Sequence, residues 1–274
     1  MDGGERQEAF WARYRQDGIW PPGPWNPAIA GLMAHRSVRA YLPDALEPGT
    51  LETLVAAAQS AASSSNLQLW DVVAVEDPAR KDRLSMLAGD QAQIREAPLF
   101  LVWIANFARA EAMAQAAGRE LDAVHYLEML MVAIVDASLA AQNATVAAES
   151  LGLGAVYIGA VRNHIDQVAA ELELPRRAFA LFGMVVGRAD PARPTDVKPR
   201  LPQAVVLHRE KFQPDANLDL ISDYDKKIME FQHEQAMAEI GWTRTVLSRL
   251  RNAGSLHGRE HAKEILSGLG FQIR

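Results

Sequence analysis

The chain has 274 residues, of which 49% are hydrophobic, and its 34 acidic and 28 basic residues give a formal net charge of -6. This length and apolar fraction are sufficient for a full buried core, whereas the negative charge argues against a broad nucleic-acid-binding face, which must be basic. The sequence contains no cysteine, which excludes disulfides, thiolate nucleophiles and cysteine-ligated metals.

The amino-terminal stretch MDGGERQEAFWARYRQDG carries charges throughout and lacks the apolar core of a signal peptide. We therefore expect a cytoplasmic protein. A short helix is expected over residues 5–16, and the following WPPGPWNP ends it because prolines fix φ and remove amide donors. Trp11, Trp20 and Trp25 indicate that residues 1–30 form an arm that docks on an apolar surface.

Hydrophobic periodicity predicts helices mixed with apolar strands in the central part of the chain. The expected strands cover residues 70–75, 98–105, 155–158 and 178–186, and the expected helices cover 48–62, 78–88, 106–124, 125–150 and 165–172. Residues 190–202 are rich in proline and should be extended, and residues 218–274 should be helical. This pattern indicates an α+β fold with a central sheet flanked by helices.

The helix expected over residues 125–150 is apolar nearly all round. Such a helix belongs in a core or against another subunit. Asp136, Gln142, Asn143 and Glu149 interrupt it and would be costly in lipid, so we expect no membrane span.

A cationic cluster stands just before the first long helical pattern. It comprises His35, Arg36, Ser37 and Arg39, and guanidinium and hydroxyl groups of this kind match phosphate oxygens. A second pair, Lys198 and Arg200, flanks a proline, and in an extended backbone these two side chains project to the same side. Together the two segments could enclose a phosphate, although a pair of solvated basic loops remains an open alternative.

Several common catalytic motifs are missing from the sequence. Gly152-Leu-Gly154 lies after a helix and before a strand, which reverses the order of a dinucleotide-binding turn. The chain has no phosphate-binding lysine loop, no serine-nucleophile elbow and no zinc-binding histidine pair of the HExxH type. We expect no metal site.

Five motifs in this order resemble the flavin-dependent nitroreductases, specifically the oxygen-insensitive NADPH-nitroreductase and flavin-reductase group. They are HRSVRAY, SSSNLQ, AQNATVAAESLGLGAVYIGAVRN, LFGMVVGRA and DVKPRLP. The resemblance implies a central mixed antiparallel sheet and an intertwined homodimer with a long buried interface helix. It also implies an arm over 1–30, an FMN-binding core over 31–214 and a C-terminal helical extension over 215–274 that packs on the dimer.

The same resemblance implies a noncovalently bound FMN whose site draws on both subunits. The residues implied to bind FMN are His35, Arg36, Ser37, Arg39, Ser63, Ser64, Ser65, Gln91, Tyr157, Ile158, Gly159, Lys198 and Arg200. Within this set the basic residues would bind the phosphate and the Gly159 backbone would lie near flavin N5. Asn66 and Gln68 would line the substrate pocket.

The implied activity is reduction of nitroaromatics, quinones or related electron-poor small molecules by a two-electron ping-pong mechanism, with NADPH or NADH as the electron donor. Because the flavin performs the chemistry, no acid–base triad is required of the protein. Two alternatives stay open, namely a flavin reductase or specialised flavoenzyme of the same fold, and a flavin-binding protein without turnover.

Overall fold

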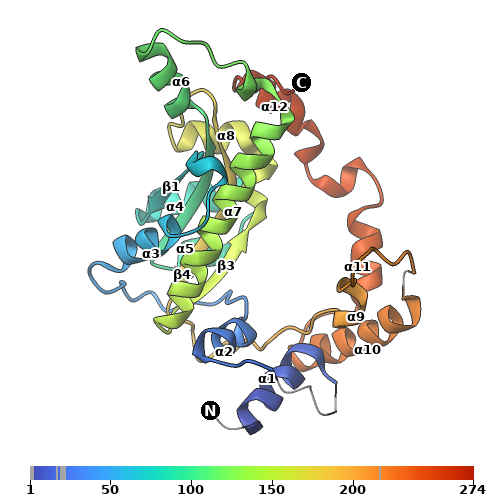
Figure 1. The fold of residues 1–274 in the computed structure, drawn as a ribbon. Coiled ribbons are helices and arrows are strands. Elements are labelled where there is room, and N and C mark those ends of the chain that lie inside the picture. Colours follow the sequence, from blue (N-terminus) through green and yellow to red (C-terminus); the bar gives the residue numbers. More distant parts are fainter. Residues whose placement is uncertain (1–2, 17, 19–22, 216) are drawn as a thin grey trace. The chain divides into compact units, whose positions relative to one another are not determined.

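The computed structural model describes residues 3–16, 18, 23–215 and 217–274. The chain forms two compact units (Figure 1). The helical unit comprises Met1–Arg36 and Thr195–Ser255, and the sheet unit comprises Ser37–Pro194 and Leu256–Arg274. The tripartite division into 1–30, 31–214 and 215–274 stays a prediction.

The sheet unit is built on four strands in the order β1-β2-β4-β3, and every neighbouring pair is antiparallel. The strands are β1 (Trp70–Val75), β2 (Leu99–Asn106), β3 (Gly154–Ile158) and β4 (Ala178–Gly187). All four lie within about one residue of the predicted ranges. The sheet was expected to be mixed, but the parallel pairing among the described residues is a single bridge between Ser37 and Ala155, beside the β3 edge.

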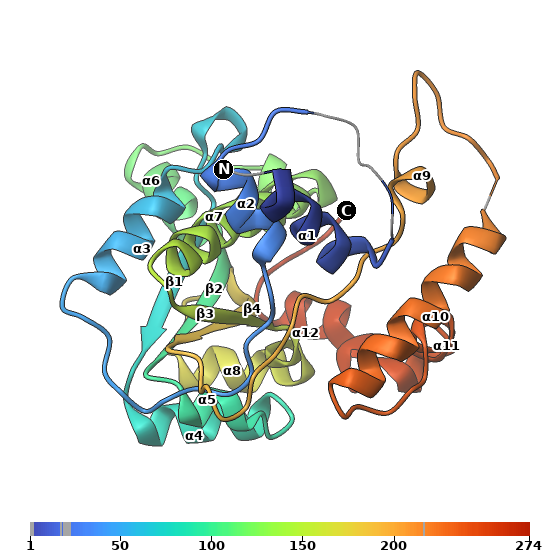
Figure 2. The ribbon, with the colours of Figure 1, turned by 90° about the horizontal axis from the view of Figure 1, so that it is seen from below.

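Helices cover both faces of this sheet (Figure 2). Along β2, Phe100 and Val102 belong to one buried cluster, whereas Leu101 and Trp103 belong to another. This alternation follows from the two-residue period of a strand, and burial on both faces explains why β2 is apolar throughout. The helices that flank the sheet are α4 (Pro78–Leu87), α5 (Ala92–Glu96) and α8 (Ile165–Glu171) on one face, and α3 (Thr50–Gln59) and α7 (Leu127–Ser150) on the other.

The long helix α7 packs on the sheet through small side chains, which allow its backbone to approach closely. The fully buried residues of this face are Ala133, Ala137, Ala140, Ala141, Ala144 and Ala148. By length and composition α7 could cross a membrane, but a core helix meets the same criterion and 44% of its most apolar window is buried within the protein. The sequence predicted a helix in a core or against another subunit, and the buried face of α7 agrees with the first of these alternatives.

The helical unit begins with α1 (Gly3–Tyr14), which matches the predicted amino-terminal helix. A second helix, α2 (Pro27–Ala34), was not predicted. It begins at the end of the proline-rich stretch because Asn26 caps it, its Oδ1 accepting from the Ile29 amide at 2.9 Å, and Pro27 occupies the first helical position. The unit also contains α9 (Gln203–Val206), α10 (Leu218–Glu234) and α11 (Trp242–Arg249).

The remaining short elements belong to the sheet unit or to its boundary. They are α6 (Ala108–Ala116), α12 (Ala262–Gly268), η1 (Ser64–Asn66), η2 (Ala123–His125), η3 (Gly159–His164), η4 (Ala253–Leu256) and η5 (Arg259–His261). In the arm, the Trp25 ring lies 5.8 Å from the Phe10 ring, whereas Trp11 is exposed. Trp20 lies outside the described residues.

The segment from Ser37 to Tyr41 runs along the β3 edge. The Val38 amide donates to the Ala155 carbonyl at 3.1 Å, and the buried Tyr41 hydroxyl donates to the Val38 carbonyl at 2.6 Å. Burial raises the pKa of the Tyr41 phenol far above its usual value, despite the nearby charge of Arg39. A Cβ built on Gly154 would lie 2.5 Å from the Val38 side chain, so glycine at this position permits the close approach.

We predict that Gly154→Ala lowers the free energy of unfolding by about 1–3 kcal/mol, because the added methyl group must displace Val38 and its pairing with β3. Urea denaturation would measure the change. Gly31→Ala is the matched control, since no atom lies within 4 Å of a Cβ added there and alanine favours a helix interior. Equal stability of Gly154→Ala and the parent would contradict this account of the β3 edge.

Candidate functional site

The predicted site residues are divided between the two units. The helical unit contains His35, Arg36, Lys198 and Arg200, and the sheet unit contains Ser37, Arg39, Ser63, Ser64, Ser65, Asn66, Gln68, Gln91, Tyr157, Ile158 and Gly159.

In the helical unit, Arg13 connects the two cationic segments. Its guanidinium donates to the carbonyls of Met33 and His35 at 2.8 Å each and to the Lys198 carbonyl at 2.9 Å. The Arg13 carbonyl in turn accepts from the Arg200 amide at 2.9 Å. The segments that carry His35 and Lys198 are therefore neighbours in the structure, as the phosphate hypothesis requires.

The guanidinium groups in these segments are available to an anion. Arg36, Arg39 and Arg200 are exposed, and within the described part of the chain none of them forms an ion pair with a carboxylate. Arg39 and Arg200 instead contact backbone carbonyls, those of Ser37 at 3.4 Å and Lys198 at 3.2 Å. In a protein with an excess of acidic residues, guanidinium groups without carboxylate partners are suited to bind a phosphate.

In the sheet unit, the Ser37 bridge to Ala155 places the segment that carries Arg39 beside β3, which ends with Tyr157 and Ile158 and leads into Gly159. The Ile158 side chain is buried, and Gly159 begins the 3₁₀ helix η3. The pairing of β3 with β4 ends at Ile158, so the Gly159 backbone does not pair with β4.

Tyr157 contacts α7 through its hydroxyl group, which lies 2.8 Å from Thr145 Oγ1. Its ring packs edge-on against Phe182, with the ring centroids 5.4 Å apart. Burial raises the pKa of Tyr157 to about 12, although the hydrogen bond to Thr145 opposes the rise. Tyr157 therefore stays a neutral phenol near pH 7 and cannot act there as a phenolate base.

The serine-rich loop after α3 is held by a buried carboxylate on α7. Asp136, only 1% exposed, accepts from the Ser63 hydroxyl at 2.6 Å and from the Ser64 amide at 3.1 Å. Ser63 Oγ also accepts from the Gln68 amide at 3.0 Å, which closes the loop on itself. This role of Asp136 was not predicted from the sequence, where the available signal was a carboxylate in the middle of an apolar helix.

The same loop adopts an unusual backbone conformation. Ser65, Asn66 and Gln68 have φ values of 49°, 54° and 50°, in the left-handed region that non-glycine residues rarely adopt. Gln68 Nε2 donates to Asn66 Oδ1 at 3.0 Å, so the two predicted substrate-pocket residues contact each other. Strain of this kind persists only where surrounding contacts impose it, and it concentrates at functional sites.

Gln91 occupies the turn before α5 and is half-buried. Its Oε1 accepts from Gln93 Nε2 at 2.7 Å, which orients the Gln91 amide.

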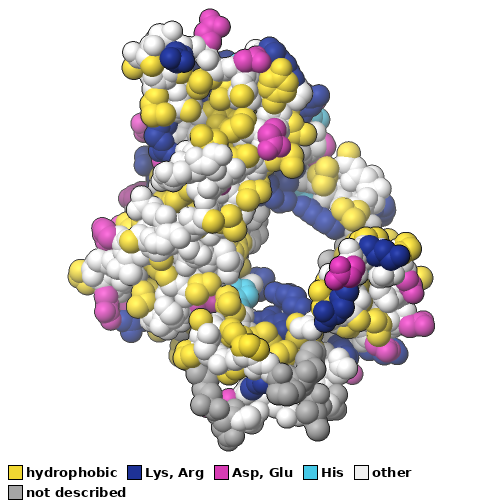
Figure 3. All heavy atoms as spheres, viewed as in Figure 1, with side chains coloured by type: hydrophobic (Ala, Val, Ile, Leu, Met, Phe, Trp, Pro, Cys, Tyr) yellow, Lys and Arg dark blue, Asp and Glu magenta, His cyan; other side chains and the backbone are white. Residues whose placement is uncertain are grey.

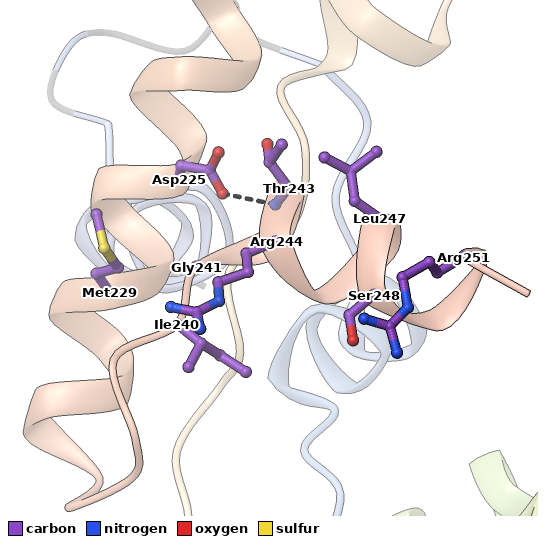
Figure 4. A pocket seen from close by; sticks show the side chains of 9 residues that line it. All are labelled: Asp225, Met229, Ile240, Gly241, Thr243, Arg244, Leu247, Ser248 and Arg251. Atoms are coloured by element: carbon purple, nitrogen blue, oxygen red, sulfur yellow. Dashed lines mark hydrogen bonds between the residues drawn. The ribbon is translucent and has the colours of Figure 1, made fainter. Parts of the chain in front are cut away.

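The helical unit also contains an open pocket between α10 and α11 (Figure 4). Asp225 Oδ1 accepts from the amides of Trp242 and Thr243 at 2.6 and 2.8 Å and thus caps α11. Burial raises the pKa of this carboxyl, but the hydrogen bonds outweigh it and the net pKa is lowered. Arg244 and Arg251 line the pocket, whereas none of the predicted flavin-binding residues does.

We predict that Asp136→Ala lowers the free energy of unfolding by about 1–3 kcal/mol, because the partly buried Ser63 hydroxyl and Ser64 amide lose their acceptor. Chemical denaturation would measure the loss. Ser150→Ala is a control at the end of the same helix, where the hydroxyl of an exposed residue bonds the Ala147 carbonyl and its removal should change stability by less than about 0.5 kcal/mol. Unchanged stability of Asp136→Ala would show that the carboxylate does not hold the loop.

Two family models match the chain. The model described as the nitroreductase family matches residues 32–188, and the model described as the nitroreductase family C-terminal domain matches residues 198–274. Residues 1–31, which include Arg13, lie outside both matches.

Individual proteins give the same result. The chain is 35% identical over 246 residues to FMN reductase (NADPH) of Bacillus subtilis, covering 87% of this chain and 97% of that protein. It is 37% identical over 206 residues to oxygen-insensitive NADPH nitroreductase of Salmonella typhimurium, covering 75% of this chain and 82% of the relative.

Among solved structures, NADPH:FMN oxidoreductase from Vibrio harveyi complexed with NAD+ superposes with a TM-score of 0.81 at 33% identity, covering 91% of this chain and 100% of that chain. This similarity agrees with the motif order in the sequence. The chain therefore belongs to the nitroreductase family.

Proposed function

We propose that this protein is an FMN-dependent NAD(P)H oxidoreductase that reduces nitroaromatics, quinones or related electron-poor acceptors in the cytoplasm. The observation that carries the proposal is the pair of cationic segments that Arg13 joins, because both segments lie in or beside the regions matched by the family models. Relatives named FMN reductase and NADPH nitroreductase support the same chemistry.

The donor groups of this chain fit the phosphate of FMN. We assign phosphate binding to His35, Arg36, Ser37, Arg39, Lys198 and Arg200, which we call the phosphate-binding set. Guanidinium, ammonium and hydroxyl donors match phosphate oxygens, and the exposed arginines of the set have no carboxylate partners among the described residues.

The flavin ring would lie against the residues of the sheet unit. The hydroxyls of Ser64 and Ser65 and the side-chain amide of Gln91 supply neutral donors, whereas the Ser63 hydroxyl is committed to Asp136 and would position the loop. The backbone of Tyr157, Ile158 and Gly159 supplies further donors where β3 ends. When bound, FMN supplies the two-electron chemistry, while the protein binds it, orients it and tunes its potential. Asn66 and Gln68 are exposed in the strained loop and are proposed to contact the acceptor.

A second copy of this chain is the proposed partner. One face of α7 exposes Met131, Ile134, Val135 and Leu139, which are 38–53% exposed and lie one helical turn apart. Figure 3 shows hydrophobic side chains on the side of the sheet unit along which α7 runs. A homodimer through this face would place Asp136, and with it the serine loop, directly behind the interface.

The activity test is an anaerobic titration of the purified protein loaded with FMN. We expect NADPH or NADH to bleach the flavin absorbance at one equivalent per site, and a nitroaromatic or quinone to restore it after the nicotinamide has left, as a ping-pong mechanism requires. Recolouring by free flavin in preference to other acceptors would favour the flavin reductase alternative. FMN binding without bleaching would identify a non-catalytic flavin protein, and failure to bind FMN would refute the proposal.

The dimer is tested by Val135→Glu, which places a charge in the proposed apolar interface. We expect the parent to sediment as a dimer, at twice the chain mass of 30.1 kDa. In Val135→Glu the dissociation constant of the dimer should be about tenfold higher or more, because the charge is costly in an apolar interface. Met113→Glu, at a methionine on α6 that is 65% exposed, is the control and should sediment like the parent. A monomeric parent, or an unaffected Val135→Glu, would contradict the proposed interface.

A further inference from the structure

Arg13 has an unusual set of partners for an arginine in an amino-terminal helix. It lies in the last turn of α1 and is only 6% exposed. Three backbone carbonyls accept from its guanidinium at 2.8–2.9 Å, and the carbonyls of His35 and Lys198 belong to residues of the phosphate-binding set. A planar guanidinium with five N–H donors can bond all three at once, whereas a lysine ammonium cannot match this geometry.

The two segments that Arg13 joins have no regular structure of their own. Residues 35–36 and 194–202 are neither helix nor strand. Ordering irregular backbone costs conformational entropy, and cationic side chains brought together also repel one another in the absence of an anion. Hydrogen bonds from Arg13 offset both costs before a ligand arrives, and such preorganisation increases affinity.

The arm itself is attached firmly within the helical unit. Arg15 forms a bidentate ion pair with Glu234 of α10, with N–O distances of 2.7 and 2.8 Å. Gln203 Nε2 donates to the Tyr14 hydroxyl at 3.4 Å. The Arg13 backbone carbonyl accepts from the Arg200 amide, so main chain and side chain of one residue hold the same segment. Residues 1–31 lie outside both family matches, so the contacts made by Arg13 come from a segment added to the matched regions.

We propose that Arg13 is a positioning residue that holds the helical-unit half of the phosphate-binding set in its binding geometry, so that the affinity for a phosphate-bearing flavin depends on the amino-terminal arm. The inference rests on the proposed FMN site. Arg13 acts through the backbones of His35 and Lys198 and donates to carbonyls, so its substitution should weaken recognition of the phosphate and leave the contacts to the flavin ring intact.

The test compares FMN with riboflavin, which has the same ring but no phosphate. Flavin-free full-length protein is titrated with each, and fluorescence quenching gives the dissociation constants. We expect Arg13→Met to weaken FMN binding by about tenfold or more while riboflavin binding changes by less than about twofold, and Arg13→Lys to show an intermediate loss. Arg6→Met is the matched control in the same helix, where the guanidinium donates to the Gly23 carbonyl at 3.2 Å, and the variant should bind FMN like the parent.

Equal losses for FMN and riboflavin would overturn the inference, because Arg13 would then support the fold in general. Unchanged FMN affinity in Arg13→Met would overturn it as well. If Arg13→Met does not fold, Arg13→Lys decides by the same FMN-to-riboflavin ratio. If the parent binds FMN and riboflavin equally well, the proposed phosphate site is refuted. If the parent prefers FMN and Arg13→Met keeps the same preference, only the role of Arg13 is refuted.

Discussion

Burial of the central sheet on both faces is the constraint on which the rest of the structure depends. Each strand of the pair β2 and β4 is covered on both sides, and unpaired polar groups there would be costly. Functional groups must therefore come from the segments where strands and helices begin or end. Most of the candidate residues obey this rule, because they lie in the loop after α3, the turn before α5, the start of η3 and the irregular segments around His35 and Lys198. Tyr157 and Ile158 are the last two residues of the edge strand β3.

Helix α7 connects these features to one another within the sheet unit. Its alanines seal one face of the sheet, Asp136 holds the serine loop, and Thr145 contacts the Tyr157 hydroxyl next to the end of β3. The opposite face of the helix is apolar and exposed. A single helix thus contributes to core packing, to the geometry of the proposed flavin site and to the proposed interface with a second copy. A substitution on one face of α7 should therefore also affect the contacts made by its other faces.

Sequence reasoning predicted the strands and the long helix well because their signals are local. The apolar run 178–186 and the nearly all-apolar stretch 125–150 can be read directly from periodicity. Helix α2 was missed because its beginning overlaps a proline-rich stretch, where Asn26 and Pro27 in fact supply a cap and a first turn. The roles of Asp136 and Arg13 could not be predicted, since Asp136 bonds Ser63, 73 residues away, and Arg13 joins His35 to Lys198, which is 185 residues from Arg13. Motif order identified the family, whereas the placement of FMN among these residues stays a prediction.

The central claim is that the cationic segments bind the phosphate of FMN, and a crystal structure of the protein with FMN tests it most directly. The decisive measurement is the distance from the phosphate oxygens to the side-chain nitrogens of Arg36, Arg39, Lys198 and Arg200. The account predicts charge-assisted contacts of about 2.7–2.9 Å from these groups, with Arg13 still bonded to the carbonyls of His35 and Lys198. A phosphate bound by other residues, with these side chains left in solvent, would contradict it.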